Sequence, residues 1–446
     1  MTSLITTTFK TLLARKFFDL LDINSNSYLP IDKRTYTFVG IGKQTPWNSG
    51  TEIAPSPDQA TRSLSQIYRD TIVLKRLSQE NASFVVQRVN WEYGTLYAAY
   101  GCGVCPAGTN FYVLNSKDQV FKCLYNNGQS LSTSEPQLSL SSTSLEEPYF
   151  ETADGYKWKY MYTLTSLQKQ RFLSSDWMPV TYNKFVRAAA VNRSLDIVRI
   201  TNSGNNYVDG GSQDIITITG DGTDAILKAN VVGGQIVDII IQNRGQDYTT
   251  ANLTISDVAG GIGSNAAAVV VFSPQNGHGY DPVEELYTST VMFNVDYDGS
   301  ENDVFPAENE YRQVYMIQNP LENGSTNLAN SEIYTAYTKV KVSPGVGDFS
   351  NDEKVFQGID LARSTFNADV ISFDENTNYL YLNNIFGTLN TNEPIKGNES
   401  GSIRVAINKT DPTIKLYSGN LLYISNSLPV SRDPDQTDRI RFVLSF

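Results

Sequence analysis

The sequence predicts a mainly β protein of the α+β class, with several domains built from antiparallel sheets and β-sandwiches. Short segments that alternate apolar and polar residues recur through most of the chain, separated by Gly, Asn, Pro and Ser clusters. Charged residues make up only 18%, whereas the 26 tyrosines favour strands over long surface helices. At 446 residues the chain is long enough for several domains with their own cores.

Helical periodicity is confined to the N-terminal part, which we expect to be a helical α+β segment over 1–82. Apolar residues at helical spacing predict an amphipathic helix over 4–21. A second helix is expected over about 58–78, started by Pro57 and Asp58. The stretch 35–42 between them reads as a strand.

A β-rich body is expected over 83–187, continuing at 281–332 and completed by C-terminal strands over 413–446. Its alternating segments include 83–91, 95–100, 110–115, 119–125 and 154–164.

The segment 154–164, DGYKWKYMYTL, interleaves aromatic rings with lysines. Such a pattern suits a base-stacking platform, a sugar-binding surface or a half-buried strand. The formal net charge of −12 and the scattered basic residues disfavour nucleic acid. We therefore expect a strand with its aromatic residues inward, and with Lys157 and Lys159 outward as rim contacts to an acidic neighbour.

Two inserted β-modules are expected, because two regions carry internal repeats. In the first, 188–280, the segment Asn202–Tyr207 recurs as 243–248, and a shortened copy at 276–280 closes the module. In the second, a small barrel-like module over 333–412, Phe349-x3-Glu353-x-Val355 recurs as Leu389-x3-Glu393-x-Ile395. Repeats of this kind are typical of scaffolds and spacers.

Few residues suggest catalytic or metal chemistry. The single histidine, His278, lies in a Gly-rich turn, and we expect it to be exposed. Cys102, Cys105 and Cys123 provide CxxC spacing and a third thiol, but the fourth ligand of a structural zinc site is absent, so loop or buried thiols are favoured. The sequence contains no phosphate-loop or nucleophile-elbow motif, and we predict that the protein is not an enzyme and binds no cofactor.

Asp296, Asp298 and Asp303 form an acidic stretch with oxygen ligands at alternate positions. Calcium is one interpretation, but the register is not that of an EF-hand, so a solvated acidic turn is favoured. The start of the chain lacks the pattern of a secretory signal, and the longest apolar run has seven residues, so we expect a soluble protein made in a cytoplasm.

Several segments, taken in order, resemble the baseplate wedge subunit family of T4-like contractile-tailed bacteriophages, of the gene-eight product type. The segments that carry the resemblance are TFVGIGKQTPWNSG (37–50), VNWEYGTLY (89–97), VFKCL (120–124), 151–164, RQVYMIQNPLE (312–322), GNLLYISNSLPV (419–430) and DQTDRIRFVLSF (435–446). The two repeat regions lie outside them and look additional to the family pattern.

The resemblance implies a structural virion protein of the tail baseplate, synthesised in the host cytoplasm. Its partners would be other wedge subunits and hub-proximal tail proteins, with a homodimer within the wedge, no nucleic acid and no membrane insertion. Such a subunit would help to set the baseplate geometry and to switch it when the sheath contracts.

Two alternatives stay open: a tail adhesin that binds host polysaccharide through the repeat modules, and a tail-borne glycan hydrolase, for which no carboxylate pair stands out. The interface candidates are the four tryptophans and the two lysines. For Trp47, Trp91, Trp158 and Trp177, core packing is the competing interpretation.

Overall fold

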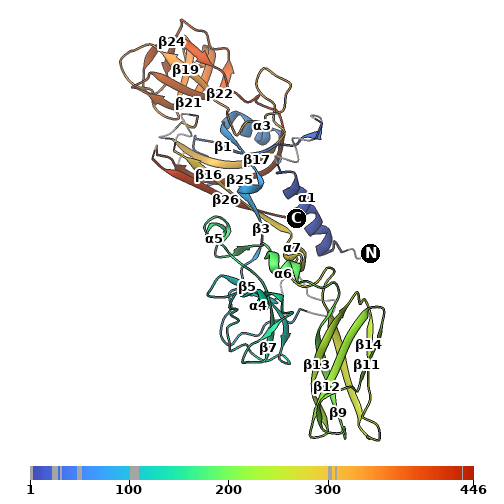
Figure 1. Cartoon of the computed structure of the whole chain (residues 1–446). Helices are drawn as coiled ribbons and strands as arrows, with labels where there is room; N and C mark the ends of the chain where they lie inside the picture. Colours follow the sequence, from blue (N-terminus) through green and yellow to red (C-terminus); the bar gives the residue numbers. More distant parts are fainter. Residues whose placement is uncertain are drawn as a thin grey trace. The chain divides into compact units, whose positions relative to one another are not determined.

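The computed structural model describes residues 4–22, 29–30, 33–47, 53–100, 110–299, 304–306, 309–433 and 435–446. The chain forms two compact units, and each is made of segments that are distant in sequence. The first combines 1–15, 83–292 and 443–446, and the second combines 16–82 and 293–442. Antiparallel strands dominate both units (Figure 1). The predicted fold class, mainly β with a few helices, is confirmed.

A five-stranded antiparallel sheet in the order β18-β2-β1-β17-β25 organises the second unit. Its strands are β18 (Ile333–Thr335), β2 (Thr71–Arg76), β1 (Thr37–Gly42), β17 (Glu310–Gln318) and β25 (Asn420–Ser431). Every residue of the central strand β1 is buried. A side chain at Gly40 would lie 2.2 Å from the Tyr315 ring, so glycine lets that ring pack across β1. No residue of β25, at the end of the sheet, is buried.

Aromatic rings join this sheet to β16 (Thr290–Asp298) and β26 (Thr437–Ser445). Phe442 stacks on Phe293 at 4.9 Å and on Tyr423 of β25 at 5.2 Å between ring centroids. Phe442 of β26 is therefore part of the interior.

Six strands in the order β19-β22-β21-β20-β23-β24 close into a barrel within the second unit, inside the range expected for the second module. The strands are β19 (Thr338–Val342), β20 (Lys354–Gly358), β21 (Ser364–Asp374), β22 (Tyr379–Gly387), β23 (Pro394–Gly397) and β24 (Ile403–Thr410). The repeat is structural, because Phe349 and Leu389 share the barrel core with Val355 and Ile395.

The body of the first unit contains a four-stranded sheet in the order β4-β5-β7-β6 and a pairing of β3 with β8. These strands are β3 (Ala82–Gln87), β4 (Tyr112–Leu114), β5 (Gln119–Asn126), β6 (Phe150–Glu151), β7 (Tyr156–Thr163) and β8 (Trp177–Pro179). The segment 95–100 was expected to be a strand, but it forms only an isolated bridge at Thr95. No described strand pairs with this segment beyond that bridge, and local alternation alone does not supply a partner.

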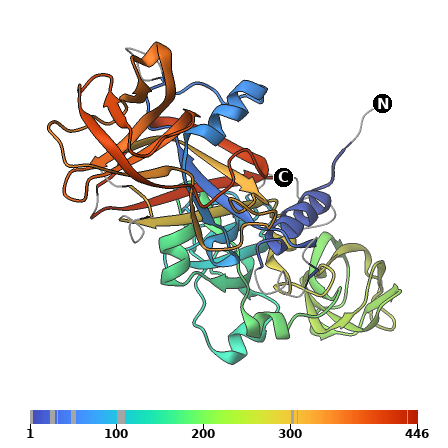
Figure 2. The same cartoon turned by 90° about the horizontal axis from the view of Figure 1, so that it is seen from above.

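The first repeat module contains seven strands in three antiparallel groups: β9 with β15, β11 with β14, and β12 between β10 and β13. The strands are β9 (Leu195–Asn205), β10 (Gly210–Gln213), β11 (Ile216–Gly220), β12 (Thr223–Val232), β13 (Gln235–Gln246), β14 (Ala251–Ile255) and β15 (Ser264–Phe272). Neighbouring groups touch along β9 and β13, β14 and β15, and β11 and β12, so they surround one core (Figure 2).

The sequence repeat of this module is also a structural repeat. In two copies an Asn side chain accepts a hydrogen bond from the Gly two residues later, at 3.0 Å for Gly204 and 3.1 Å for Gly245. Both glycines have positive φ, and each copy ends in a buried tyrosine, Tyr207 or Tyr248. Positive φ strains other residues, which explains glycine at these positions.

Helices are few and mostly short in the described chain: α1 (Thr7–Asp19), α3 (Thr61–Asp70), α4 (Ser142–Glu146), α5 (Ser166–Phe172), α6 (Lys184–Ala188), α7 (Pro282–Glu285) and the 3-10 turns η2 (Gln79–Asn81) and η3 (Leu361–Arg363). The first predicted helix is confirmed by α1. The second is wrong in its latter half, because α3 ends at Asp70 and β2 begins at Thr71. The run Ile72-Val73-Leu74 is buried in the sheet, and strand pairing overrides the helical spacing.

We predict that Gly245→Ala destabilises the first repeat module more than Gly233→Ala does. Both glycines have φ near +60°, so alanine is strained at either position by about 1 kcal/mol. At position 245 the new Cβ would also lie 2.4 Å from the Thr223 carbonyl oxygen, whereas position 233 opens into free space. Urea unfolding should show a loss of about 2–4 kcal/mol for the first variant and about half of that or less for the second. Equal losses would contradict the proposed close packing of the repeat turn.

Candidate functional site

A buried charge cluster lies where the first repeat module meets the body sheet of the first unit. The Lys122 ammonium, on β5, donates to Nδ1 of His278 at 2.6 Å and also contacts the Glu285 carboxylate of α7. All three side chains are at most 3% exposed. A cation–π contact places the ammonium 4.2 Å from the centre of the Tyr100 ring. Because an unpaired buried charge is very costly, these groups depend on one another.

A second set of charges extends the cluster into the module. Asp196, on β9, is buried and lies 3.8 Å from Nε2 of His278 and 3.5 Å from the Arg244 guanidinium of β13. A neutral imidazole that accepts at Nδ1 carries its proton on Nε2, so His278 presents its N–H to Asp196. Lys159, on β7, is buried nearby and donates to the Glu147 carbonyl oxygen at 2.7 Å. The cluster thus combines residues of both the body and the module.

The environment shifts the pKa of each of three groups away from its ordinary value. Burial and the Lys122 charge lower the pKa of His278, so the imidazole is neutral near pH 7. Burial raises the pKa of Glu285, but Lys122 and His278 outweigh it and hold that pKa at about 2. Burial lowers the pKa of Lys159 to about 8, opposed by the charge of Asp196. Buried charges at such a junction fix its geometry through direction-dependent contacts.

Glycines make room for His278. A side chain at Gly277 would lie 2.5 Å from the backbone nitrogen of Val191, and one at Gly279 would lie 2.3 Å from Val186. The Glu285 carboxylate also accepts a hydrogen bond from the Gly279 N–H at 2.8 Å. The prediction of an exposed turn histidine is therefore wrong: the Gly-rich segment packs tightly against the body, and glycine here marks close approach as well as turning.

The strand predicted at 154–164 is present as β7, with its aromatic residues inward. Lys157 is half-buried, and its ammonium lies 5.0 Å from the centre of the Tyr149 ring. The prediction that Lys159 faces solvent is wrong, because the opposite face of β7 is covered as well. The alternation correctly separated two faces, but it did not reveal that both are buried.

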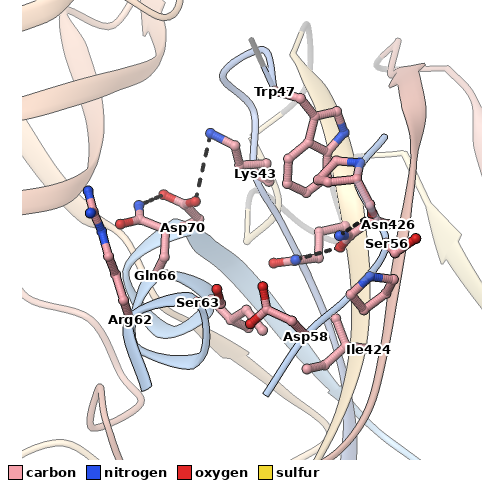
Figure 3. Close-up of a pocket in the computed structure, with 14 residues that line it drawn as sticks. Lys43, Trp47, Ser56, Asp58, Arg62, Ser63, Gln66, Asp70, Ile424 and Asn426 are labelled. Carbon is pink, nitrogen blue, oxygen red and sulfur yellow. Dashed lines mark hydrogen bonds and ion pairs between the residues drawn. The ribbon is translucent and has the colours of Figure 1, made fainter. Parts of the chain in front are cut away.

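The second candidate site is a hollow of about 300 Å³ in the second unit, between α3, the end of β1, the segment 53–58 and β25. Figure 3 shows Trp47, Lys43 and Asp58 around it, with Ile424 and Asn426 contributed by β25. The Trp47 indole donates to the Ser427 carbonyl oxygen at 2.9 Å, which fixes one wall against β25. Apolar walls beside a few polar groups are typical of binding surfaces.

Lys43 and Asp70 form the polar side of this hollow. Their charged groups are 3.9 Å apart, and Gln66 donates to the Asp70 carboxylate at 2.7 Å (Figure 3). Burial raises the pKa of Asp70, opposed by the Lys43 charge and the Gln66 hydrogen bond. Asn426 bridges the opposite side by donating to the Pro55 carbonyl oxygen at 2.9 Å. Hydrogen bonds therefore fix the lining residues of the hollow on two sides.

The structure separates the four tryptophans into two groups. Trp158 is fully buried and stacks on Tyr156 at 5.4 Å, as expected for core packing, and it is not available at the surface. Trp47, Trp91 and Trp177 are half-buried. The Trp91 indole donates to the Ser132 hydroxyl at 3.0 Å. These three remain candidates for interface contacts.

The candidate metal ligands are not brought together where the structure describes them. Cys102, Cys105 and Asp303 lie outside the described residues. Cys123 is buried among aromatic rings, and its thiol contacts the Tyr125 carbonyl oxygen at 3.5 Å.

The acidic turn expected at 296–303 instead begins as strand β16, where Asp296 pairs with Arg439 at 2.8 Å and Asp298 accepts from Thr437 at 2.6 Å. Across the described ranges, no group of three or more His, Cys, Asp or Glu residues is arranged to hold a metal ion. None of the helices in these ranges has the length and apolarity that crossing a membrane requires.

The comparisons with known proteins identify no family: no protein-family model matches the chain, and no curated protein does. The candidate sites are therefore assigned from their own geometry. Sequence reasoning missed Lys122, Glu285 and Asp196. For Lys122 and Asp196 the local signal is a single charged residue inside an apolar strand, whereas Glu285 lies in α7 and gives no such signal. A lysine at the centre of the apolar run VFKCL was that signal for Lys122.

We predict that Lys122→Met and Glu285→Gln each lower the free energy of unfolding by about 3–5 kcal/mol, because each leaves a buried charge without its partner. The double variant should lose clearly less than the sum of the two single losses, because it leaves neither charge. Urea unfolding of the four proteins measures this coupling. Additive losses would contradict a direct Lys122–Glu285 interaction.

Acidification should destabilise the first unit through His278. A histidine whose folded-state pKa lies below 6.5 stabilises the fold fully above that value, and the stabilisation is lost as the pH falls below it. The contribution of Glu285 is lost lower, between about pH 4.5 and 2. We expect the Tm to fall between pH 7.5 and 5.5 in the wild type and to fall less steeply in His278→Asn, whose amide oxygen still accepts from Lys122. Parallel curves would contradict this role of His278.

Proposed function

We propose that this protein is a structural component of a contractile phage tail, a baseplate wedge subunit that binds other wedge subunits and helps to set and switch baseplate geometry. The observation that carries the proposal is the ordered resemblance of seven segments, from 37–50 to 435–446, to that family. A chance match is disfavoured by the fixed order and because the segments span both ends of the chain.

The location of these segments supports the proposal. They contribute β1, β17 and β25 of the five-stranded sheet, β5 and β7 of the body sheet, and β26. The first repeat module and the barrel lie outside them. Insertions are best tolerated at surface loops of an existing body, so this division fits an older body that carries two additional modules.

The chemistry of assembly would be burial of aromatic anchors with shape complementarity. Three half-buried tryptophans, Trp47, Trp91 and Trp177, suit such contacts, since tryptophan is enriched where binding energy is concentrated. Switching would rearrange preformed interfaces between neighbouring wedge subunits. The extensive hydrogen bonding within the barrel and the repeat module is consistent with rigid parts of this kind.

The alternative of a polysaccharide-binding adhesin gains little support from the repeat module. Its repeat tyrosines, Tyr207 and Tyr248, are buried in the core and offer no exposed ring for a sugar. Glycan arrays probed with the whole protein test this alternative. Specific binding that is lost on substitution within 188–280 would favour it over the wedge proposal.

We expect the purified protein to form a dimer and to co-assemble with the other wedge proteins of the same virus. Size-exclusion chromatography with light scattering measures both, and a cryo-electron-microscopy map of the whole tail would locate the chain. Trp177→Ala should weaken co-assembly if that ring is an anchor, whereas Trp158→Ala should unfold the body with a loss of about 3–5 kcal/mol. A monomer that binds no other tail protein would overturn the proposal.

A further inference from the structure

The outer edge of β25 combines length with the absence of charge. Among the described residues, β25 has a single ladder partner, β17, so the backbone groups on its other side have no strand beside them. The stretch 419–430 contains no charged residue. Edge strands usually carry lysines, bulges or short lengths that prevent pairing with other chains. Here Pro429 and two bulges toward β17 are present, but no charge protects the twelve-residue edge.

A groove follows this edge. Next to the hollow of about 300 Å³ beside Ile424 and Asn426 lies a second one of about 620 Å³, lined on one side by Gly419 and by residues 420–424 of β25. Its other wall is formed by 57–59 and by Leu64 and Tyr68 of α3. Both volumes fall in the range of about 300–1,000 Å³ typical of ligand pockets. The segment 53–60 runs beside β25 without joining the ladder.

The side chains of the groove indicate what it accepts. Leu422 is 45% exposed and lines the larger hollow. The apolar ring of Pro57 lines it as well. Asp58 is the one charged residue that lines the larger hollow, and it also lines the smaller one together with Lys43 and Arg62. Its carboxylate accepts the Ala60 N–H at 2.8 Å, which fixes its position at the start of α3. A peptide with alternating apolar side chains and one basic residue complements this lining.

We propose that β25 binds an extended segment of another protein chain by strand addition, with apolar side chains of that segment in the groove and a lysine or arginine beside Asp58. Main-chain hydrogen bonds to the edge of β25 that has no strand partner among the described residues would supply affinity, and the two hollows would select alternate side chains. The proposal rests on the proposed assembly function, since it names a surface through which a neighbouring subunit is held. Binding of an extended peptide to β25 does not require the other wedge proteins, so it can be tested with this chain alone.

The test uses the full chain and three blocked hexapeptides. The first alternates valine and threonine and carries one arginine, the second has glutamate in place of that arginine, and the third has proline at alternate positions. Hydrogen–deuterium exchange locates binding, and fluorescence anisotropy measures affinity. We expect the arginine peptide to slow exchange in 420–431, the glutamate peptide to bind about two- to fivefold more weakly, and the proline peptide to give no protection.

Two variants separate the contributions. Asp58→Asn keeps an oxygen that accepts the Ala60 N–H, so it should remove the preference for arginine without weakening the glutamate peptide. Leu422→Lys should weaken the arginine peptide by about tenfold or more, because it charges the edge and narrows the groove. Leu167→Lys is the matched control, since Leu167 is 61% exposed on α5 in the other unit and the charge added is the same.

The proposal is overturned if the arginine peptide leaves exchange in 420–431 unchanged, or if Leu422→Lys and Leu167→Lys bind it equally. It is also overturned, in favour of a second copy of this chain as the occupant, if sedimentation shows a dimer that Leu422→Lys abolishes. Peptide protection of β25 together with failure to co-assemble with wedge proteins would support strand addition and reject only the wedge assignment.

Discussion

The first unit depends on how the Lys122 ammonium is compensated in its interior. This lysine lies among buried residues at the centre of β5, and it is tolerated because His278, Glu285 and the Tyr100 ring surround it. Two of these groups, His278 and Glu285, belong to the segment that follows β15, the last strand of the repeat module. The body sheet therefore cannot bury its central lysine unless the module's closing segment is in place. Replacing a whole buried ion pair by apolar residues of similar volume is often neutral or stabilising. We therefore interpret the Lys122 and Glu285 charges as groups that fix one arrangement of the module and the body.

Glycine and histidine have linked roles in this arrangement. Gly277 and Gly279 allow the backbone to approach Val191 and Val186, and this approach brings the His278 ring to Lys122. The same Gly-x-x-Tyr pattern elsewhere in the module ends in tyrosines that fill its core. One repeated unit is thus used in two ways: two copies build the interior of the module, while the third attaches it to the body.

Much of the fold was predictable, because strand alternation and turn residues are local signals. The strand β1 and the alternating segments that form β5 and β7 fall where the sequence placed them, and both repeats are structural. The errors at Lys159, His278 and 71–78 share one cause: each position is determined by residues distant in sequence. A lysine on the polar side of an alternating strand is indistinguishable from a solvent-facing one until Glu147 and Asp196 are found beside it. Likewise, the groove beside β25 depends on which strand lies at the end of the sheet, and topology of that kind is not encoded in a local pattern.

The two candidate sites differ in what their polar groups do. In the buried cluster every charge is satisfied within the chain, which suits a rigid joint and leaves little for a ligand. Beside β25 the hydrogen bonds of Trp47 and Asn426 attach the walls of the hollow to the strand, while the edge itself keeps one row of backbone groups without a strand partner among the described residues. A long uncharged edge favours aggregation unless it is covered. A protein that is stable alone would be expected to protect such an edge with charge, whereas a subunit of an assembly gains by keeping it able to pair. The buried cluster thus has its charges compensated within the chain, whereas the edge of β25 lacks a strand partner among the described residues, and the proposed strand addition rests on this second feature.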